Sequence, residues 1–291
     1  MNTCRICNQK NVGVDFSFNQ YQIYGCRNCK FRWLNPQPTD EELSEIYSNQ
    51  YFLDEGAAEI TEMVNKLKRA TAGLYLEQLI KDTSTFQLQA SLLEIGCGMG
   101  DFLLEAQSKG FAVSGLEVTD YLVQLANHRL GFSGVQKGYL ESSGFNKESF
   151  DVVAFFDVIE HVRDPLDFMA RVNGLLRKSG KVYIVTPSLD SWSAKLLGKN
   201  WMEYKVEHLS YFSKKSITLL LEQTGFHKIK FHSNYKVLNF DYINRHFVRF
   251  PVRAISPLIN FARKLTPDKL VYMPLKLVAS GIAVIAEKSG N

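Results

Sequence analysis

Four cysteines stand as two pairs near the start of this 291-residue chain. Cys4 and Cys7 form one C-x2-C pair, and Cys26 and Cys29 form the other after eighteen intervening residues. This spacing is typical of a zinc site with four thiolate ligands, which leaves no coordination position for a substrate. We therefore expect a structural Zn²⁺ held by these four cysteines, with two unrelated cysteine pairs as the alternative.

A glycine-rich segment is the second group of interest. Gly96-Cys-Gly-Met-Gly100 follows the apolar strand pattern of residues 91–95 and precedes an apolar helix pattern. Glycines let a backbone approach a ligand closely, and a helix N-terminus points N–H groups at it. Asp101 breaks the dinucleotide pattern G-x-G-x-x-G. The next strand pattern, 112–116, leads into Glu117, where a carboxylate can bind both hydroxyls of a ribose.

Two histidines are candidates for acid–base chemistry. His161 follows the apolar strand pattern of residues 149–156, and His208, preceded by Glu207, lies in the aromatic and charged loop 201–212. Histidine suits the role of a base because its ordinary pKa lies near neutrality. We expect His208, with Glu207 or His161, to position or deprotonate a substrate. The alternative for each histidine is a hydrogen-bonding residue that only fixes its loop.

Periodic apolar patterns indicate the elements that must position these residues. Alternation over 12–18 and 21–24 predicts a hairpin between the cysteine pairs, and alternating strand and helix patterns farther on predict a parallel sheet. The fold class is therefore α/β. We expect a zinc ribbon over 1–38, a helical linker or lid over 39–88, a ligand-binding core over 89–240, a basic amphipathic insertion over 241–275, and the last core strand over 276–291.

Local signals give the bounds of several helices. Thr39 with Glu42 forms a capping-box pattern, and a longer helix is expected from Ala57 to Lys81, beyond the aromatic stretch 47–52. Asp164 is expected to cap a helix that reaches Leu176 and is closed by Gly180. Ser213 is expected to cap a helix that runs through Gln223 and stops at Gly225.

The glycine segment resembles a known family. Leu93-Glu-Ile-Gly-Cys-Gly-Met-Gly100, with an acidic residue closing the next strand, resembles the first motif of class I S-adenosylmethionine-dependent methyltransferases. Residues 149–161 and 175–185 are similar to the family's fourth strand and fifth-strand entry. The resemblance implies a Rossmann-like seven-stranded sheet, with a helical insertion here before its last strand, and S-adenosylmethionine as methyl donor. The implied donor-binding residues are Glu94, Gly96, Cys97, Gly98, Gly100, Glu117, Val118 and Asp157.

The ribbon and the core together resemble bacterial methyltransferases of sugar and polysaccharide pathways, including sugar-nucleotide C-methyltransferases with a four-cysteine zinc domain. In those enzymes a Glu–His pair after the fifth strand serves the substrate, which matches Glu207 and His208, while His161 matches a substrate-side histidine. Their large C-terminal domain has no counterpart in this sequence. The resemblance implies methyl transfer to an oxygen or carbon of a small acceptor, such as a sugar, a nucleotide sugar or a lipid-linked intermediate, with His208 as candidate base.

Basic residues gather near the end of the chain. The net charge is only +4, but residues 242–267 hold five Lys or Arg and no acid. Such a segment suits an anionic membrane surface, an anionic substrate or a dimer partner, and a solvated helix face is the plainer alternative. The first residues show no secretory signal, so we expect a cytoplasmic protein, with peripheral contact at the inner membrane face through 241–275 as a further expectation.

Two other functions remain open on sequence grounds. The first is an RNA methyltransferase that docks RNA on the ribbon, and the second is a non-catalytic adaptor that only binds ligand. The fourth strand runs into Phe156-Asp-Val-Ile159, without the Pro-Pro-aromatic signature of exocyclic-amine methylation, and the ribbon has few basic residues. Nucleic acid is therefore not the expected partner, and the glycine segment with Glu117 favours an enzyme over an adaptor.

Overall fold

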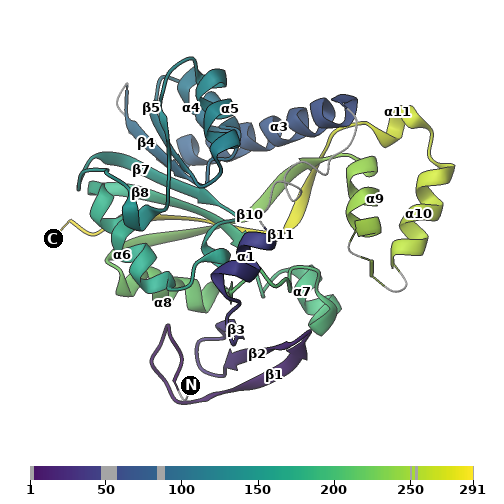
Figure 1. The fold of residues 1–291 in the computed structure, drawn as a ribbon, viewed down its shortest axis with the longest axis horizontal. Coiled ribbons are helices and arrows are strands. Elements are labelled where there is room, and N and C mark those ends of the chain that lie inside the picture. The colour runs from purple at the N-terminus through teal and green to yellow at the C-terminus, as the bar shows by residue number, and fades with distance from the viewer. Residues whose placement is uncertain (1–2, 47–57, 84–88, 250, 253–254, 291) are drawn as a thin grey trace.

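The computed structural model describes residues 3–46, 58–83, 89–249, 251–252 and 255–290. The aromatic stretch 47–52 expected to cover the core lies outside these residues. Within the described part, a seven-stranded sheet forms the body, and a four-stranded sheet lies beside it at the N-terminal end (Figure 1). The division into an α/β body and a small N-terminal module follows the fold class predicted from the sequence.

The large sheet has the strand order β10-β11-β8-β7-β4-β5-β6. Five of its strands are parallel to one another: β4 (Ser91–Ile95), β5 (Ala112–Glu117), β6 (Val135–Lys137), β7 (Phe150–Phe156) and β8 (Leu176–Pro187). β11 (Leu275–Lys288) runs antiparallel between β8 and β10 (Phe226–Leu238). The central strand β7 and the second half of β8 are buried apolar runs, because both faces of the sheet are covered there. The predicted Rossmann-like seven-stranded sheet is confirmed.

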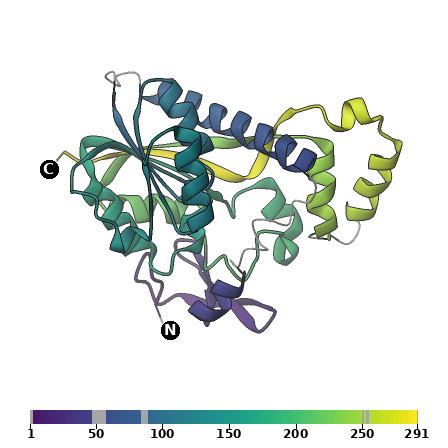
Figure 2. The same cartoon turned by 45° about the horizontal axis from the view of Figure 1, so that its top comes forward.

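Helices cover the two faces (Figure 2). On one face α3 (Ala58–Asp82), α4 (Asp101–Ser108) and α5 (Asp120–Leu130) share an apolar core with the sheet. On the other face α6 (Pro165–Leu175) and α8 (Lys214–Gln223) share a second core with it. Because every central strand is packed on both sides, the strand ends and their loops are held in fixed positions.

The helix predicted to begin after Asp164 has the expected start but a different C-terminal end. Asp164 caps α6 as expected, accepting from the backbone N–H groups of Leu166 and Asp167. However, α6 ends at Leu175, and the expectation that the helix reached Leu176 and closed at Gly180 was wrong. Leu176 is already extended, and Gly180 lies inside β8 where a Cβ would come within 2.9 Å of a backbone oxygen. The glycine therefore serves a close backbone approach rather than a helix end.

Other capping predictions are confirmed. Ser213 and Ser216 form a capping box at the start of α8. The N–H of Thr39 donates to the Glu42 carboxylate, and the N–H of Glu42 donates to the Thr39 hydroxyl, at the start of α1 (Asp40–Ile46). These local signals were read correctly because each depends on residues only three apart.

The small sheet has the order β1-β2-β3-β9. β1 (Val12–Phe18) and β2 (Tyr21–Cys26) form the predicted hairpin, and β3 (Arg32–Asn35) follows the second cysteine pair. β9 (Ser210–Tyr211) comes from the loop that contains His208. The pairing of β3 with β9 joins the N-terminal module to the body and was not predicted.

The insertion before the last strand is helical and projects from the body beyond β10 and β11 (Figure 1). It consists of α9 (Phe240–Arg249), α10 (Ile255–Leu265) and α11 (Asp268–Val271), and we call it the helical arm. Leu258, Phe261 and Leu265 each expose more than 60% of their surface. Arg253, one of the five basic residues of the stretch 242–267, lies outside the described residues. No helix among the described residues is long and apolar enough to cross a bilayer.

Candidate functional site

The glycine segment lies at the end of β4, in front of the N-terminus of α4. Gly96, Gly98 and Gly100 all have positive φ angles, of 70°, 52° and 77°. A Cβ on Gly96 would lie 2.7 Å from a methyl carbon of Val158, so the loop packs tightly against the end of β7. A Cβ on Gly98 would meet nothing within 4 Å, which shows that this part of the loop faces open space.

Glu117 holds the loop from the end of β5. Its carboxylate accepts the N–H of Gly98 at 2.9 Å, and those of Val118 and Thr119 at 2.9 and 3.0 Å. The side chain of Val118 is exposed beside it. A carboxylate has about four lone-pair sites, so Glu117 can still accept a hydrogen bond from a hydroxyl of a ligand.

Two other predicted donor-site residues are buried under the loop. Burial raises the pKa of Glu94, and the nearby charges of Asp101 and Glu117 raise it further. Oε2 of Glu94 has no hydrogen-bond partner among the described residues. Burial likewise raises the pKa of the Cys97 thiol, whose sulfur packs against Gly115 of β5. Cys97 thus fills space beneath the loop as a neutral thiol.

A second polar group gathers at the end of the neighbouring strand β7. A short 3₁₀ turn, η2 (Ile159–His161), follows β7 and brings Glu160 and His161 together with His208. One donor atom from each of the three lies within 4.8 Å of the others. The two imidazoles meet edge to face, with ring centroids 4.7 Å apart. We call these three residues the Glu-His-His cluster.

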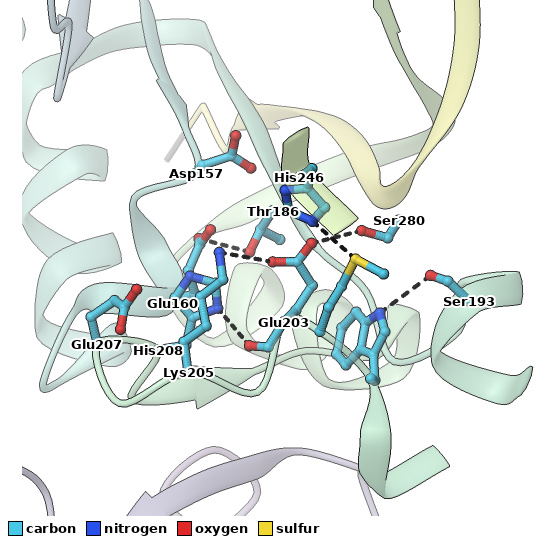
Figure 3. A network of polar contacts seen from close by, with 12 residues as sticks. Asp157, Glu160, Thr186, Ser193, Glu203, Lys205, Glu207, His208, His246 and Ser280 are labelled. Carbon is cyan, nitrogen blue, oxygen red and sulfur yellow. Dashed lines mark hydrogen bonds and ion pairs between the residues drawn. The ribbon is translucent and has the colours of Figure 1, made fainter. Parts of the chain in front are cut away.

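Backbone carbonyls fix both imidazoles. Nδ1 of His208 lies 2.8 Å from the carbonyl oxygen of Glu203 (Figure 3), and Nδ1 of His161 lies 3.0 Å from that of Glu207. A carbonyl can only accept, so each Nδ1 carries the proton and each Nε2 carries the lone pair. Burial lowers the pKa of both histidines to about 3, with Lys205 adding to the effect on His208.

Glu160 is buried and only half satisfied. Its Oε2 accepts the hydroxyl of Thr186 at 2.9 Å, as Figure 3 shows, while Oε1 has no hydrogen-bond partner among the described residues. Burial raises the pKa of Glu160, and the negative charge of Asp157 raises it further. Glu160 directly precedes His161 in the sequence, and this position already indicated that both could face the donor pocket.

Asp157 lies between the strand end and the cluster. Its Oδ2 is 2.8 Å from Nζ of Lys236 on β10. Partial desolvation opposes ionisation of Asp157, whose side chain is 45% exposed, but the Lys236 ammonium outweighs it and lowers the pKa of the carboxyl. A negative Asp157 acts on both histidines and on Glu160, which places it beside the cluster.

The glycine loop and the Glu-His-His cluster meet at one edge of the sheet. β4 and β7 are paired parallel neighbours, so the residues that follow them emerge side by side. The contact between Gly96 and Val158 joins the two groups directly, because Val158 lies only two residues before Glu160. The structure therefore brings the predicted donor residues and both predicted histidines into one site.

Other loop residues take part in ways that the sequence did not indicate. Glu207 supplies its carbonyl to His161, rather than its side chain. Glu203 holds His208 by its carbonyl, while its carboxylate accepts the hydroxyl of Ser280 at 2.9 Å and lies 3.7 Å from Nζ of Lys205. These roles depend on backbone geometry, which residue types alone do not reveal.

The four N-terminal cysteines also gather as predicted. Sγ of Cys4 lies 3.5 Å from Sγ of Cys29, Sγ of Cys7 lies 3.5 Å from Sγ of Cys26, and all four sulfurs lie within 4.8 Å of one another. Tetrahedral zinc with Zn–S bonds of about 2.3 Å separates its sulfurs by about 3.8 Å. The tetrad therefore fits a Zn²⁺ ion.

The ribbon is hydrogen-bonded to the loop of the cluster. In the pairing of β3 with β9, Trp33 faces Ser210, and the N–H of Leu34 donates to the carbonyl of Leu209 at 3.0 Å. The N–H of Leu209 donates in turn to the carbonyl of Glu160 at 2.8 Å. A short chain of backbone contacts thus connects the cysteine module to the cluster.

Comparison with known proteins gives sequence relatives of part of the chain. Ubiquinone biosynthesis O-methyltransferase of Saccharophagus degradans is 31% identical over 104 residues, which are 34% of this chain and 44% of that protein. The enzyme of the same name from Caulobacter vibrioides is 32% identical over 102 residues, 33% of this chain and 40% of that protein. The chain therefore spans less than half the length of these two curated relatives.

Solved structures share the fold at low identity. A SAM-dependent methyltransferase from Archaeoglobus fulgidus has a TM-score of 0.53 at 18% identity, covering 82% of this chain and 100% of that chain. The YcgJ protein from Bacillus subtilis also has a TM-score of 0.53 at 18% identity, covering 75% of this chain and 99% of that chain. At these identities the likeness shows the fold alone.

A family model described as a methyltransferase domain matches residues 65–230, more than half of the chain. The matched segment contains β4 to β8, the glycine loop, Glu117 and both histidines of the cluster. The chain belongs to this methyltransferase-domain family.

Proposed function

We propose that the chain transfers the methyl group of S-adenosylmethionine to a hydroxyl oxygen of a small acceptor held at the Glu-His-His cluster. The observation that carries the proposal is the contact between Gly96 and Val158, which puts the donor loop and the cluster side by side. The names of the sequence relatives, which are O-methyltransferases, support oxygen over carbon as the methylated atom.

The donor side of the site fits S-adenosylmethionine, which when bound supplies an electrophilic methyl group on a sulfonium. Glu117 would accept a hydrogen bond from a ribose hydroxyl, and the loop from Gly96 to Gly100 would line the amino-acid end. The unpartnered Oε2 of Glu94 beneath that loop suits the ammonium group of the ligand. Val118 and Asp157 would border the bound donor on either side of the loop.

On the acceptor side, the cluster must align the hydroxyl with the methyl group and help its proton to leave. His208 and His161 offer neutral imidazoles, and backbone carbonyls accept the Nδ1 proton of each ring. In a metal-free site, the lone pair on Nε2 of His208 is the candidate base. Glu207 would position His161 through its carbonyl.

The helical arm supports a lipid-linked acceptor over a free nucleotide sugar. Its exposed apolar side chains, Leu258, Phe261 and Leu265, occur in a region, residues 240–276, with seven Lys or Arg and two Asp. Apolar side chains set among cations complement an anionic bilayer surface. We infer that the arm lies on such a surface and brings the site to an acceptor anchored there.

We also propose that the cysteine tetrad binds a structural Zn²⁺. Four thiolates close its coordination shell, so this ion would act by holding the ribbon together. The ribbon in turn holds β9, and so the loop that contains His208, through the pairing of β3 with β9.

A mass-spectrometric acceptor screen tests the proposal. The full chain is incubated with S-adenosylmethionine and, separately, with lipid-linked sugars, nucleotide sugars and RNA. We expect a mass gain of one CH₂ on a hydroxyl oxygen of a lipid-linked acceptor, its loss in His208→Asn, and no change in the exposed control His128→Asn. Methylation of RNA or of a nitrogen atom, or full turnover in His208→Asn, would overturn it.

A further inference from the structure

We propose that Glu160, His161 and His208 bind a divalent first-row metal ion such as Zn²⁺, and that this ion binds the acceptor hydroxyl. The inference rests on the proposed function, since the ion would act on the acceptor at the same site. It adds a second metal to the chain, separate from the one at the cysteine tetrad.

The first argument is the ligand set. Two imidazoles and one carboxylate, each with a donor atom within 4.8 Å of the others, are the protein ligands of catalytic zinc sites. Three protein ligands leave at least one coordination position for a substrate oxygen. The cysteine tetrad, by contrast, offers four sulfurs and no open position.

The second argument is the unpartnered oxygen of Glu160. The residue is only 1% exposed, and its Oε1 has no hydrogen-bond partner among the described residues. Thr186 fixes the other oxygen, so the carboxylate cannot turn without losing that bond. A buried polar atom left unsatisfied is costly in free energy, and a bound cation removes that cost.

The third argument is the support behind the histidines. Metal-binding histidines commonly donate their other ring N–H to a carbonyl or carboxylate, which fixes the ring and its tautomer. His161 and His208 both have this arrangement, with Nδ1 on the carbonyls of Glu207 and Glu203. The N–H of Leu209, next to His208, donates to the carbonyl of Glu160 and keeps the two segments in register.

The bound ion would act as a Lewis acid, without any change of oxidation state. Binding to the cation acidifies the acceptor hydroxyl, whose O–H bond breaks and whose proton passes to solvent water. The oxygen lone pair then forms the bond to the methyl carbon as the C–S bond breaks, and that electron pair stays on the sulfur as a neutral thioether. With the ion in place, His208 holds the metal and the proton leaves without it.

Metal counting tests the inference on the full chain. The protein is loaded with Zn²⁺, dialysed against metal-free buffer and analysed by mass spectrometry of its metal content. We expect about two equivalents in the wild type and about one in Glu160→Gln and in His208→Asn, with about two retained in the control His128→Asn. Loading with Co²⁺ gives a second readout, because the thiolate charge-transfer band of the tetrad should persist in both cluster variants.

One equivalent in the wild type, or two in both cluster variants, would overturn the inference. Thermal unfolding and calorimetry with S-adenosylmethionine check that each variant is folded. If Glu160→Gln does not fold, the metal content of His208→Asn decides the test. The same samples distinguish a failure of the cluster-metal proposal from a failure of the proposed function. A wild type with one equivalent that still methylates a hydroxyl contradicts the cluster metal alone, whereas two equivalents without methylation of any acceptor contradict the proposed function.

Discussion

At the scale of single residues, Glu117 connects the donor loop to the expected ligand. Its carboxylate already orders the loop by accepting three backbone N–H groups, including that of Gly98. The same carboxylate is expected to accept a hydrogen bond from the ribose. One side chain therefore both shapes the donor site and binds the donor.

Replacement of Glu117 should weaken donor binding strongly. In Glu117→Ala a hydrogen bond from the ribose to a charged group is lost, which contributes roughly 1.5–3 kcal/mol, so the Kd for S-adenosylmethionine should rise about 10- to 100-fold. Calorimetry measures this, with Glu222→Gln on the exposed face of α8 as control. An unchanged Kd in Glu117→Ala would show that the donor binds elsewhere.

The sequence predicted only part of the site at this scale. The donor residues and His161 and His208 could be found because their positions follow strands whose parallel ends share one edge. The contributions of Glu203 and Glu207 could not, since both act through backbone carbonyls. A ligand role for Glu160 becomes apparent only when its burial and its unpartnered oxygen are seen together.

At the scale of elements, the tight packing of β4 against the end of β7 makes the glycine loop sensitive to any side chain. Gly96→Ala would place a Cβ 2.7 Å from Val158 at a φ of 70°. We expect a loss of about 1–3 kcal/mol in the free energy of unfolding, together with weaker donor binding. Urea unfolding measures this against Gly144→Ala, whose Cβ would meet nothing within 4 Å. Equal stability of the two variants would contradict the packing argument.

The helical arm should bind anionic vesicles through its apolar side chains. Phe261→Glu combined with Leu265→Glu removes two exposed apolar groups, each contributing about 1.5 kcal/mol or more when buried in lipid, and adds repulsive charge. We expect at least a tenfold loss of binding, about 1.4 kcal/mol, in sedimentation with anionic vesicles. Phe132→Glu, an exposed aromatic outside the arm, is the control. Binding that survives the double change would exclude the arm as the membrane contact.

Elements set by local signals were predicted well, and those set by distant contacts were not. The capping boxes at Thr39 and Ser213 depend on neighbours in sequence, and both are present. The end of α6 was misplaced because Gly180 serves β8, where the backbone oxygen of Arg177 in the same strand comes close. β9 escaped prediction because it has only two residues and pairs with β3, far away in the sequence.

At the scale of the whole molecule, the ribbon and the body share one sheet. β9 belongs to the loop of the cluster and pairs with β3 of the ribbon, while the hydroxyl of Ser213 donates to the carbonyl of Cys29 at 3.1 Å. The donor loop instead follows β4 and is held by Glu117 at the end of β5. Damage to the ribbon should therefore reach the acceptor side of the site before the donor side.

Loss of the tetrad should separate the two halves of the activity. In Cys26→Ser or Cys29→Ser the ribbon loses a metal ligand and β9 loses its support, so methyl transfer should fall at least about tenfold. The Kd for S-adenosylmethionine should stay within about twofold of wild type, because Glu117 and the glycine loop are untouched. Gln9→Ala, at an exposed position of the ribbon that is not a metal ligand, is the control. A variant that loses donor binding and keeps turnover would contradict this division.

The central claim is that the donor loop and the Glu-His-His cluster form one methyl-transfer site. Single-turnover transfer from ¹³C-methyl S-adenosylmethionine to the acceptor tests it most directly, with the donor saturating in wild type and in His208→Asn. We predict labelled ether product in the wild type and a rate lower by about a hundredfold or more in the variant, with equal donor occupancy. Equal rates of label transfer at equal donor occupancy would contradict the claim.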